Sequence, residues 1–285
     1  MAFKKIKEYI STDDATAGTL LIPQTILATL IEETDKNLLD RSLARFVLGP
    51  SQIPGSQISV NLNVHDTGKI REVGEGAEIP LDAGDYEAVT FTPVKFGVSI
   101  RITGEMMEDS QFPLLQDQIR TFGRRFAENE TKLILTSLDG ANITITGGAS
   151  ITVANITTGM QNLWDEDFSP SDIIVGAAVL NDIMNIDTFA EADKWGGVTA
   201  NQTGQIGRIY GMNLHLFSRN AAPATNYNLR AYILDRREAF AIAIKRDITV
   251  ENVMLPLFDM EGAVITQRID VQLLKSRAVT LITTT

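Results

Sequence analysis

The segment 110–138 constrains the fold more than any other part of the chain. Its large apolar residues recur at steps of three, four and seven, which places them on one face of a helix. These residues are Leu115, Ile119, Phe122, Phe126 and Leu133. Pro113 suits the first turn, Gly140 is placed to end the helix, and Glu128 precedes Lys132 at the spacing of a helical ion pair. At about 1.5 Å per residue, the helix would be roughly 40 Å long, so we expect a sheet packed along one side of it.

Composition and charge exclude several classes of function. The chain has 285 residues, enough for one large domain or two ordinary ones. Its formal net charge of −11 argues against a surface that binds nucleic acid tightly all over, because such binding needs clustered Lys and Arg. There is no cysteine, so disulfides and thiol chemistry are excluded. We find no membrane-spanning apolar run and no signal-peptide pattern, and we expect a soluble protein made in a cytoplasm.

Two alternating segments predict a long hairpin. Apolar and polar residues alternate over 58–64 and again over 94–102, as in strands with one buried face. The segment 65–87 between them is rich in charge and glycine and poor in large apolar residues. A lone two-stranded hairpin is only marginally stable in water, so we expect this one to lie on a neighbouring copy of the protein. The alternative is an ordinary hairpin folded onto its own domain.

The apolar parity changes at Thr92-Pro93. Val89 and Phe91 alternate on one parity, whereas Val94 and the apolar residues after it follow the other. A shift of one residue exchanges the two faces of a strand, and proline is tolerated where a ladder is interrupted. We therefore expect a bulge or kink at this point.

The remaining sequence predicts a terminal arm, a lobe and a strand-rich end. Residues 1–20 resemble an arm, 23–46 a helix, and about 158–228 a lobe inserted between the long helix and the closing strands. Within and around the lobe we expect two short strands in 142–153, a short helix at 158–164, a buried strand at 172–176 leading to a helix, a turn and strand in 204–217, and a polar surface loop at 220–228. From 229 onward we expect strands over RAYILD, EAFAIAIK, DITVENV and AVITQRIDVQLLKSRAVTLIT.

A search for catalytic or metal-binding patterns finds none that is convincing. His65 and His215 are far apart in sequence, and neither has a second ligand at metal spacing. There is no P-loop and no G-x-S-x-G elbow. The carboxylates 165–167 are best explained as a solvated helix end, and the glycines Gly204 and Gly207 as turn residues rather than a nucleic-acid clamp. We expect no enzyme activity, catalytic residue, cofactor or metal.

The order of these parts resembles the HK97-like major capsid proteins of tailed double-stranded DNA viruses. Three stretches carry the resemblance. EVGEGAEIP followed by YEAVTFTPVKFGVSIRITGEM is similar to the family's extended loop returning into its peripheral domain. Glu108-Asp109-Ser110 resembles the start of the family's spine helix, and residues 204–216 are similar to the late turn and strand of its axial domain.

The resemblance implies an α+β fold in four parts. These are an N-terminal arm and helix (1–51), an extended hairpin loop (52–100), a peripheral domain with the spine helix (101–157 and 231–285) and an axial domain (158–230). It also implies a virion protein, assembled in the host cytoplasm, that forms hexamers and pentamers of an icosahedral head enclosing double-stranded DNA. Packed DNA is largely neutralised by counterions, so the acidic composition does not conflict with this role. The resemblance implies scaffolding, portal and decoration proteins as partners. It does not imply a membrane partner.

Interface residues are expected in the hairpin. We predict that Arg71, Glu72 and Glu75 form pairs across subunits. Some relatives cross-link a hairpin lysine to an asparagine of a neighbour, and Lys69 is placed to do so; a solvated lysine at the tip is the alternative. Some relatives also carry a long N-terminal scaffolding segment, whereas only about 20 residues precede the first expected helix here.

Two other functions remain open from the sequence. One is an encapsulin-like shell of a bacterial compartment, which would share the fold. The other is a soluble β-rich hydrolase that uses carboxylates of the 65–87 loop, for which a deep pocket in a monomer would be the sign.

Overall fold

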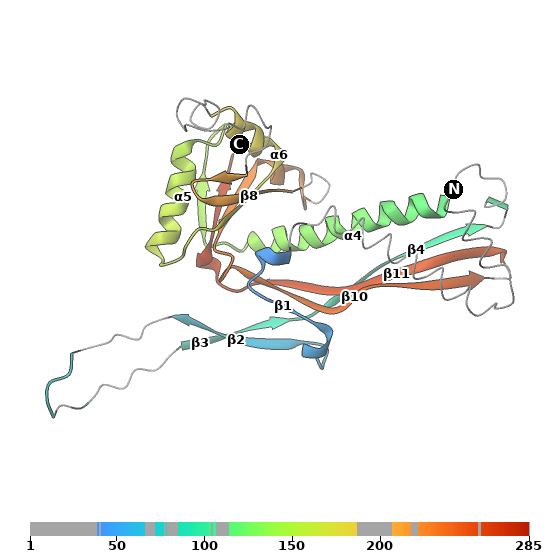
Figure 1. Cartoon of the computed structure of the whole chain (residues 1–285), viewed down its shortest axis with the longest axis horizontal. Coiled ribbons are helices and arrows are strands. Elements are labelled where there is room, and N and C mark those ends of the chain that lie inside the picture. The colour runs from blue at the N-terminus through green and yellow to red at the C-terminus, as the bar shows by residue number, and fades with distance from the viewer. Residues whose placement is uncertain are drawn as a thin grey trace.

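The computed structural model describes residues 39, 41–65, 72–76, 78, 85–103, 105–106, 114–186, 207–217, 222–255 and 258–284. It has three parts (Figure 1). A long helix lies along a narrow sheet, and we call this the peripheral arm. A second sheet with two helices forms the lobe at one end of the arm. A two-stranded hairpin extends away from the body on the side of the sheet opposite the helix.

The predicted long helix is confirmed as α4, Leu114–Leu138. Residues 110–113 lie outside the described residues. Ile119 and Phe126 are buried, and they pack with Ile100, Ile248 and Ile265 of the underlying sheet. Gly140 follows the helix as expected, and its N–H donates to the Ser137 carbonyl at 3.1 Å.

The sheet of the peripheral arm has four strands in the order β1-β10-β11-β4. They are β1 Val47–Leu48, β10 Phe240–Leu255, β11 Met260–Leu273 and β4 Val94–Thr103. The separate strands expected over EAFAIAIK and DITVENV are in fact one strand, β10, because its ladder with β11 continues through two register shifts between Ile244 and Thr249. Gly262 is required in β11, since a Cβ there would lie 1.9 Å from the Ile100 carbonyl oxygen.

A hairpin is present, but its returning strand differs from the expected one. Strand β2, Ile58–His65, pairs with β3, Asp85–Phe91, whereas the alternating segment 94–102 lies in β4 and pairs with β11 of the arm sheet. At Thr92-Pro93 the chain leaves the hairpin and enters β4, so the parity change marks a passage between two sheets. The Thr92 N–H donates to Asp270 Oδ2 at 2.7 Å and secures this passage.

The hairpin root packs on the face of the arm sheet that α4 leaves free. Leu62 and Phe91 form one apolar cluster with Ala241 and Ala243 of β10. Ile242, between those alanines, belongs instead to the cluster that contains the end of α4. Because successive side chains of a strand point to opposite faces, α4 and the hairpin root lie on opposite sides of the sheet.

The lobe contains a six-stranded sheet in the order β5-β12-β9-β6-β8-β7. Its elements are β5 Ile143–Thr146, α5 Val153–Asp165, β6 Asp172–Val175, α6 Ala177–Met184, β7 Arg208–Ile209, β8 Met212–Leu216, β9 Arg230–Leu234 and β12 Val279–Thr283. The strand β6 and the helix after it confirm the expectation for 172–185. Strands β5, β9 and β12 pair here, although the sequence assigned them to the peripheral domain; the domain boundaries themselves stay a prediction.

Local predictions in the lobe have mixed outcomes. Only one strand forms in 142–153, because Thr152 caps α5 by accepting the Asn155 N–H at 3.3 Å, so the helix begins at Val153 rather than 158. The turn and strand expected in 204–217 are present as residues 210–211 and β8, and the short strand β7 before them pairs with β8. The expected surface loop contains the 3-10 helix η5, Thr225–Leu229, whose Tyr227 is buried.

The described part of the N-terminal region is not α-helical. The 3-10 helix η1, Arg41–Leu43, is followed by bends, so the helix predicted for 23–46 does not reach Phe46; residues 1–38 lie outside the described residues. Two further short turns are η2, Pro50–Gln52, and η7, Ser276–Ala278. In the described part of the chain, no helix is long and apolar enough to cross a membrane.

Candidate assembly surfaces and the polar clusters behind them

The hairpin presents an acidic surface to solvent. Its described charged side chains beyond β2 are Glu72, Glu75, Glu78 and Glu87, and all of them are exposed. Tyr86 is 68% exposed, the highest value among the exposed large apolar residues. Of the residues predicted to form subunit contacts, Glu72 and Glu75 therefore lie together on an exposed segment, while Lys69 and Arg71 lie outside the described residues. His65 ends β2, and its side chain is also outside them.

The face of the arm sheet opposite α4 carries exposed cations. On β4, Lys95 and Arg101 are exposed, and the small residues Gly97 and Ser99 between them leave this face flat. Arg246 of β10 is also exposed on it, by its register with Arg268, and so is the acid Glu251, by its register with Val264 and Ser99. Beyond the hairpin root, this face is covered by none of the described elements. It is therefore available to a partner of negative charge.

A buried ion pair attaches η1 to the peripheral arm. The side chain of Glu130 on α4 is only 1% exposed. Both Glu130 oxygens accept from Arg41, at 2.6 and 2.8 Å, and Gln267 of β11 donates to the same carboxylate at 3.4 Å. This contact was missed from sequence, although an acid on the apolar side of a predicted helix is a signal that a partner is present.

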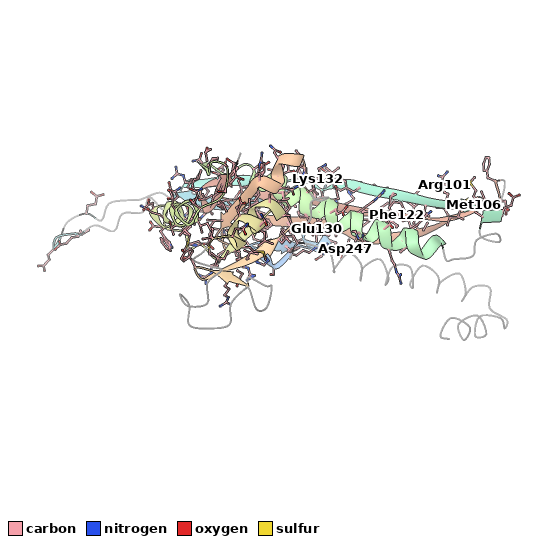
Figure 2. The ribbon with its side chains drawn as sticks, turned by 90° about the horizontal axis from the view of Figure 1, so that it is seen from above. Arg101, Met106, Phe122, Glu130, Lys132 and Asp247 are labelled. Carbon is pink, nitrogen blue, oxygen red and sulfur yellow. The ribbon has the colours of Figure 1, made fainter. Side chains whose placement is uncertain are left out.

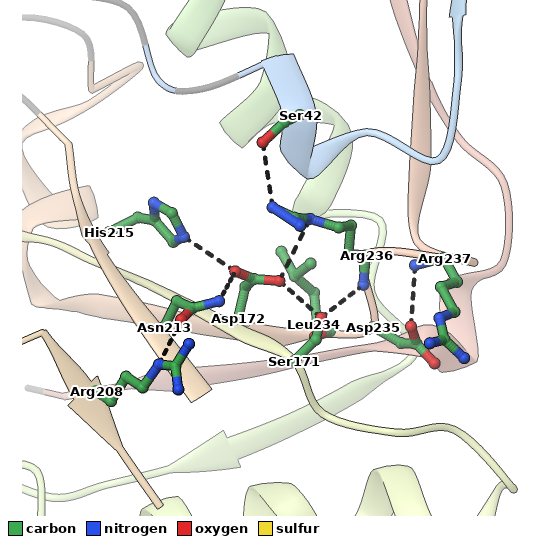
Figure 3. A network of polar contacts seen from close by, with 10 residues as sticks. All are labelled: Ser42, Ser171, Asp172, Arg208, Asn213, His215, Leu234, Asp235, Arg236 and Arg237. Atoms are coloured by element: carbon green, nitrogen blue, oxygen red, sulfur yellow. Dashed lines mark hydrogen bonds and ion pairs between the residues drawn. The ribbon is translucent and has the colours of Figure 1, made fainter. Parts of the chain in front are cut away.

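A polar cluster around Asp172 joins the lobe to the root of the arm (Figure 3). One carboxylate oxygen of Asp172 lies 3.0 Å from His215 Nε2 and accepts from Asn213 at 3.1 Å, and the other accepts from Ser171 Oγ at 2.7 Å. Arg236 Nε is 3.8 Å from the second oxygen, and its Nη2 donates to Ser42 at 3.1 Å. The Asp172 carboxylate thus connects four elements: β6, β8, the turn that follows β9, and η1.

The surroundings of Asp172 favour its charged form. Burial alone would raise the pKa of this carboxyl group. The hydrogen bonds from His215, Ser171 and Asn213, together with the positive charge of Arg236, outweigh burial and lower the pKa to about 2. His215, which showed no metal-ligand spacing in the sequence, is therefore a structural partner of this carboxylate. Its link to Asp172 was missed because 43 positions separate the two residues.

A second cluster holds the end of α4 against the lobe. Asp139 Oδ1 accepts from Arg230 at 2.6 Å and from Tyr232 at 2.7 Å, while Tyr227 donates its hydroxyl proton to the other oxygen. Burial raises the pKa of the Tyr232 hydroxyl, and the hydrogen bond that it donates to Asp139 raises it further. All three donors come from η5 and β9, so the C-terminal end of the long helix is fixed to the lobe.

No arrangement suited to catalysis is evident in the described residues. None of their His, Asp and Glu side chains form a group of three that could hold a metal ion. A shallow groove of about 240 Å³ lies between α4 and β4, lined chiefly by Phe96, Val98, Phe122 and Phe126. Its polar lining residues, Arg125 and Asn129, do not form an acid–base pair.

Comparisons with known proteins agree with this description. A family model described as phage capsid protein matches residues 86–274, well over half of the chain. The chain belongs to this family of phage capsid proteins, and it has the HK97-like fold. It is accordingly a structural protein of a capsid shell and a component of a virion. A comparison with curated proteins finds no match.

Solved structures share the fold at low sequence identity. The mature capsid of bacteriophage PhiM1 has a TM-score of 0.68 and 10% identity, with 87% of each chain covered. A structure from Microbacterium phage Oxtober96 has a TM-score of 0.66 and 14% identity, covering 86% of this chain and 90% of that one. A virus-like particle from Pyrococcus furiosus has a TM-score of 0.61 and 8% identity, covering 91% and 98%.

Proposed function

We propose that the chain is the major capsid protein of a tailed virus. Its copies would form hexamers and pentamers that close into an icosahedral head around double-stranded DNA, assembled in the host cytoplasm. Scaffolding, portal and decoration proteins would be its other partners, and its role would be structural rather than catalytic. The observation that carries the proposal is a two-stranded hairpin that extends away from the body and whose apolar contacts with the arm sheet are confined to its root. We also propose the division into arm, hairpin, peripheral and axial domains, with β5, β9 and β12 counted in the axial domain because they pair in the sheet of the lobe.

The hairpin of one copy would lie on the arm sheet of the next. The hairpin root occupies the face of the sheet opposite α4, so the hairpin runs in the layer on that side of the molecule. Neighbouring copies in a shell wall have the same side outward, and the hairpin therefore reaches the corresponding face of its neighbour. That face is cationic through Lys95 and Arg101, whereas the hairpin tip is acidic through Glu72 and Glu75. Complementary charges of this kind fix the register of an interface.

The interface residues are proposed from the same charges. Glu72 and Glu75 would pair with Lys95 and Arg101 of the neighbour, and Arg71 would pair with an acid across the contact. Lys69 would lie at the same contact. The sequence predicted only the hairpin residues of this interface. Lys95 and Arg101 of the neighbour are added from the structure.

A charge-swap experiment tests the contact. Glu72→Lys/Glu75→Lys and, separately, Lys95→Glu/Arg101→Glu would each juxtapose like charges, so we expect each variant to stop shell formation. The combined variant restores opposite charges, and we expect shells to return. The measurement is negative-stain electron microscopy with light scattering of the purified chain. Glu128→Lys/Lys132→Glu on α4 is the control, which should assemble normally.

Two results would contradict the proposal. Shells that survive simultaneous charge reversal of Arg71, Glu72 and Glu75 would remove the hairpin contact. A wild-type chain that stays a monomer in the presence of its scaffolding protein would contradict the proposed assembly into hexamers and pentamers.

A compartment shell is the second candidate, because the Pyrococcus furiosus virus-like particle shares the fold. The contents of purified shells distinguish the two functions. Double-stranded DNA in particles from infected cells favours the viral head, whereas a co-purifying cargo enzyme in otherwise empty shells favours the compartment.

A further inference from the structure

The exposed face of α4 has a charge opposite to that of the whole chain. Arg120, Arg124, Arg125 and Lys132 are exposed along it. Among the described side chains of this helix, the only acids are Glu128, which is partly buried, and Glu130, which is paired with Arg41. The chain as a whole has a formal net charge of −11. The negative charge therefore lies elsewhere, and this helix face is a local cationic surface.

These cations are not used by the fold. Within the described residues, no ion pair involves Arg120, Arg124 or Lys132, and the ion pair expected between Glu128 and Lys132 is not formed. Arg125 is the exception in having a partner, because its guanidinium lies 5.5 Å from the Phe122 ring centre. Figure 2 shows Lys132 on the helix, with Phe122 further toward the free end of the arm. A row of unpaired cations in an acidic protein is suited to an anionic partner.

The layer arrangement places this row on one side of the shell wall. The arm sheet has α4 on one face and the hairpin root on the other. Neighbouring hairpins dock on the second face according to the proposed function, on which this step rests. None of the described elements, and no docked hairpin, then covers the α4 face, which is directed either into the head or out of it.

We propose that the exposed face of α4 is the lumenal surface and that Arg120, Arg124 and Lys132 contact phosphates of the enclosed double-stranded DNA. Phosphates attract Lys and Arg without regard to base sequence, and each contact releases condensed counterions. The contacts are independent of sequence, because they are made to phosphates and not to base edges. An acidic composition and a DNA-facing surface are compatible here because the charges are segregated.

The salt dependence of DNA binding tests this inference. The purified full-length chain, below its assembly concentration, is titrated with a labelled random-sequence 30-bp duplex at several salt concentrations. Each phosphate contact contributes about 0.9 to the slope of log K against log salt. We expect Arg120→Gln/Arg124→Gln to reduce the magnitude of that slope by about 1.8. Adding Lys132→Gln should bring the reduction to about 2.7.

Two matched controls separate the α4 face from net charge. Arg120→Lys/Arg124→Lys keeps both charges and should keep the wild-type slope. Arg237→Gln/Arg277→Gln removes the same charge from exposed positions near the lobe, where Arg277 pairs with Glu166 at 3.1 Å, and should also keep the wild-type slope. An unchanged slope for the α4 variants, or an equal reduction in the Arg237/Arg277 control, would overturn the inference.

The same variants separate a failure of the DNA-contact proposal from a failure of the capsid proposal. If all variants form shells in the microscope but the α4 substitutions leave DNA binding unchanged, the lumenal DNA contact is wrong and the capsid proposal stands. Binding of an acidic protein segment, with no salt-dependent binding of the duplex, would equally overturn the DNA contact.

Discussion

At the scale of single residues, Asp172 shows how a buried charge holds separate parts of the chain together. Its side chain is 1% exposed, yet the surrounding donors lower its pKa to about 2 from an ordinary value of 3.8. A folded-state pKa below the unfolded value contributes stability above about pH 4, and this contribution is lost as the pH falls toward 2. The shift corresponds to about 2 kcal/mol.

We therefore expect the free energy of unfolding of Asp172→Asn to depend less on pH in the acid range than that of the wild type. Near pH 7 the variant should unfold with a free energy lower by about 3 kcal/mol, because His215 and Arg236 lose their charged partner. The difference from wild type should narrow by about 2 kcal/mol between pH 5 and pH 2. Denaturant unfolding of the unassembled chain at several pH values measures it. A difference that stayed constant with pH would show that Asp172 has no lowered pKa in the folded state.

At the scale of elements, α4 is held by one buried ion pair as well as by its apolar face. Removing one partner of a buried pair leaves an uncompensated charge and costs about 3–5 kcal/mol, whereas replacing both with apolar residues costs much less. We expect Arg41→Met to be strongly destabilising and Arg41→Met/Glu130→Met to recover most of the loss. The loss of stability is measured as a lower midpoint of urea unfolding, with the m-value of the transition unchanged.

The control for this pair is on the same helix. Glu128→Gln lies two positions from Glu130 but outside the ion pair, and a surface substitution of this kind should change stability by no more than about 0.5 kcal/mol. An equal loss in Glu128→Gln and Glu130→Gln would mean that α4 is sensitive to any lost acid rather than to the Arg41 pair.

The elements that the sequence predicted correctly are those with long periodic patterns. The apolar repeat of α4 and the alternation of β2 and β4 extend over many residues, so local pattern outweighs tertiary context. The predictions fail where a single local hydrogen bond sets the secondary structure. At Thr152 the N-capping bond begins α5 where a strand was expected. The clusters of Asp172 and Asp139 could not be predicted, because their hydrogen-bond partners other than the adjacent Ser171 are 41 to 93 positions away in the sequence and are brought close only by the folding of the lobe.

At the scale of the whole molecule, the hairpin serves two purposes that can be separated. Its root contributes Leu62 and Phe91 to an apolar cluster with the arm sheet, and so belongs to the folded monomer. The described acids of its tip, Glu72, Glu75 and Glu78, are exposed. Folding and assembly should therefore respond differently to removal of the tip.

The register of the hairpin provides the means to remove it. His65 and Asp85 are opposite each other in the ladder, so a two-residue Asn-Gly turn of type I′ can replace residues 66–84. We expect this variant to retain the circular dichroism spectrum and, within a few degrees, the melting temperature of the wild-type monomer, because the root cluster is intact. It should form no shells in sedimentation velocity, because the neighbour's Lys95 and Arg101 have no acidic partner. Shells from the shortened chain would place the assembly contact outside the tip, whereas an unfolded chain would show that the tip is needed for the monomer's own stability.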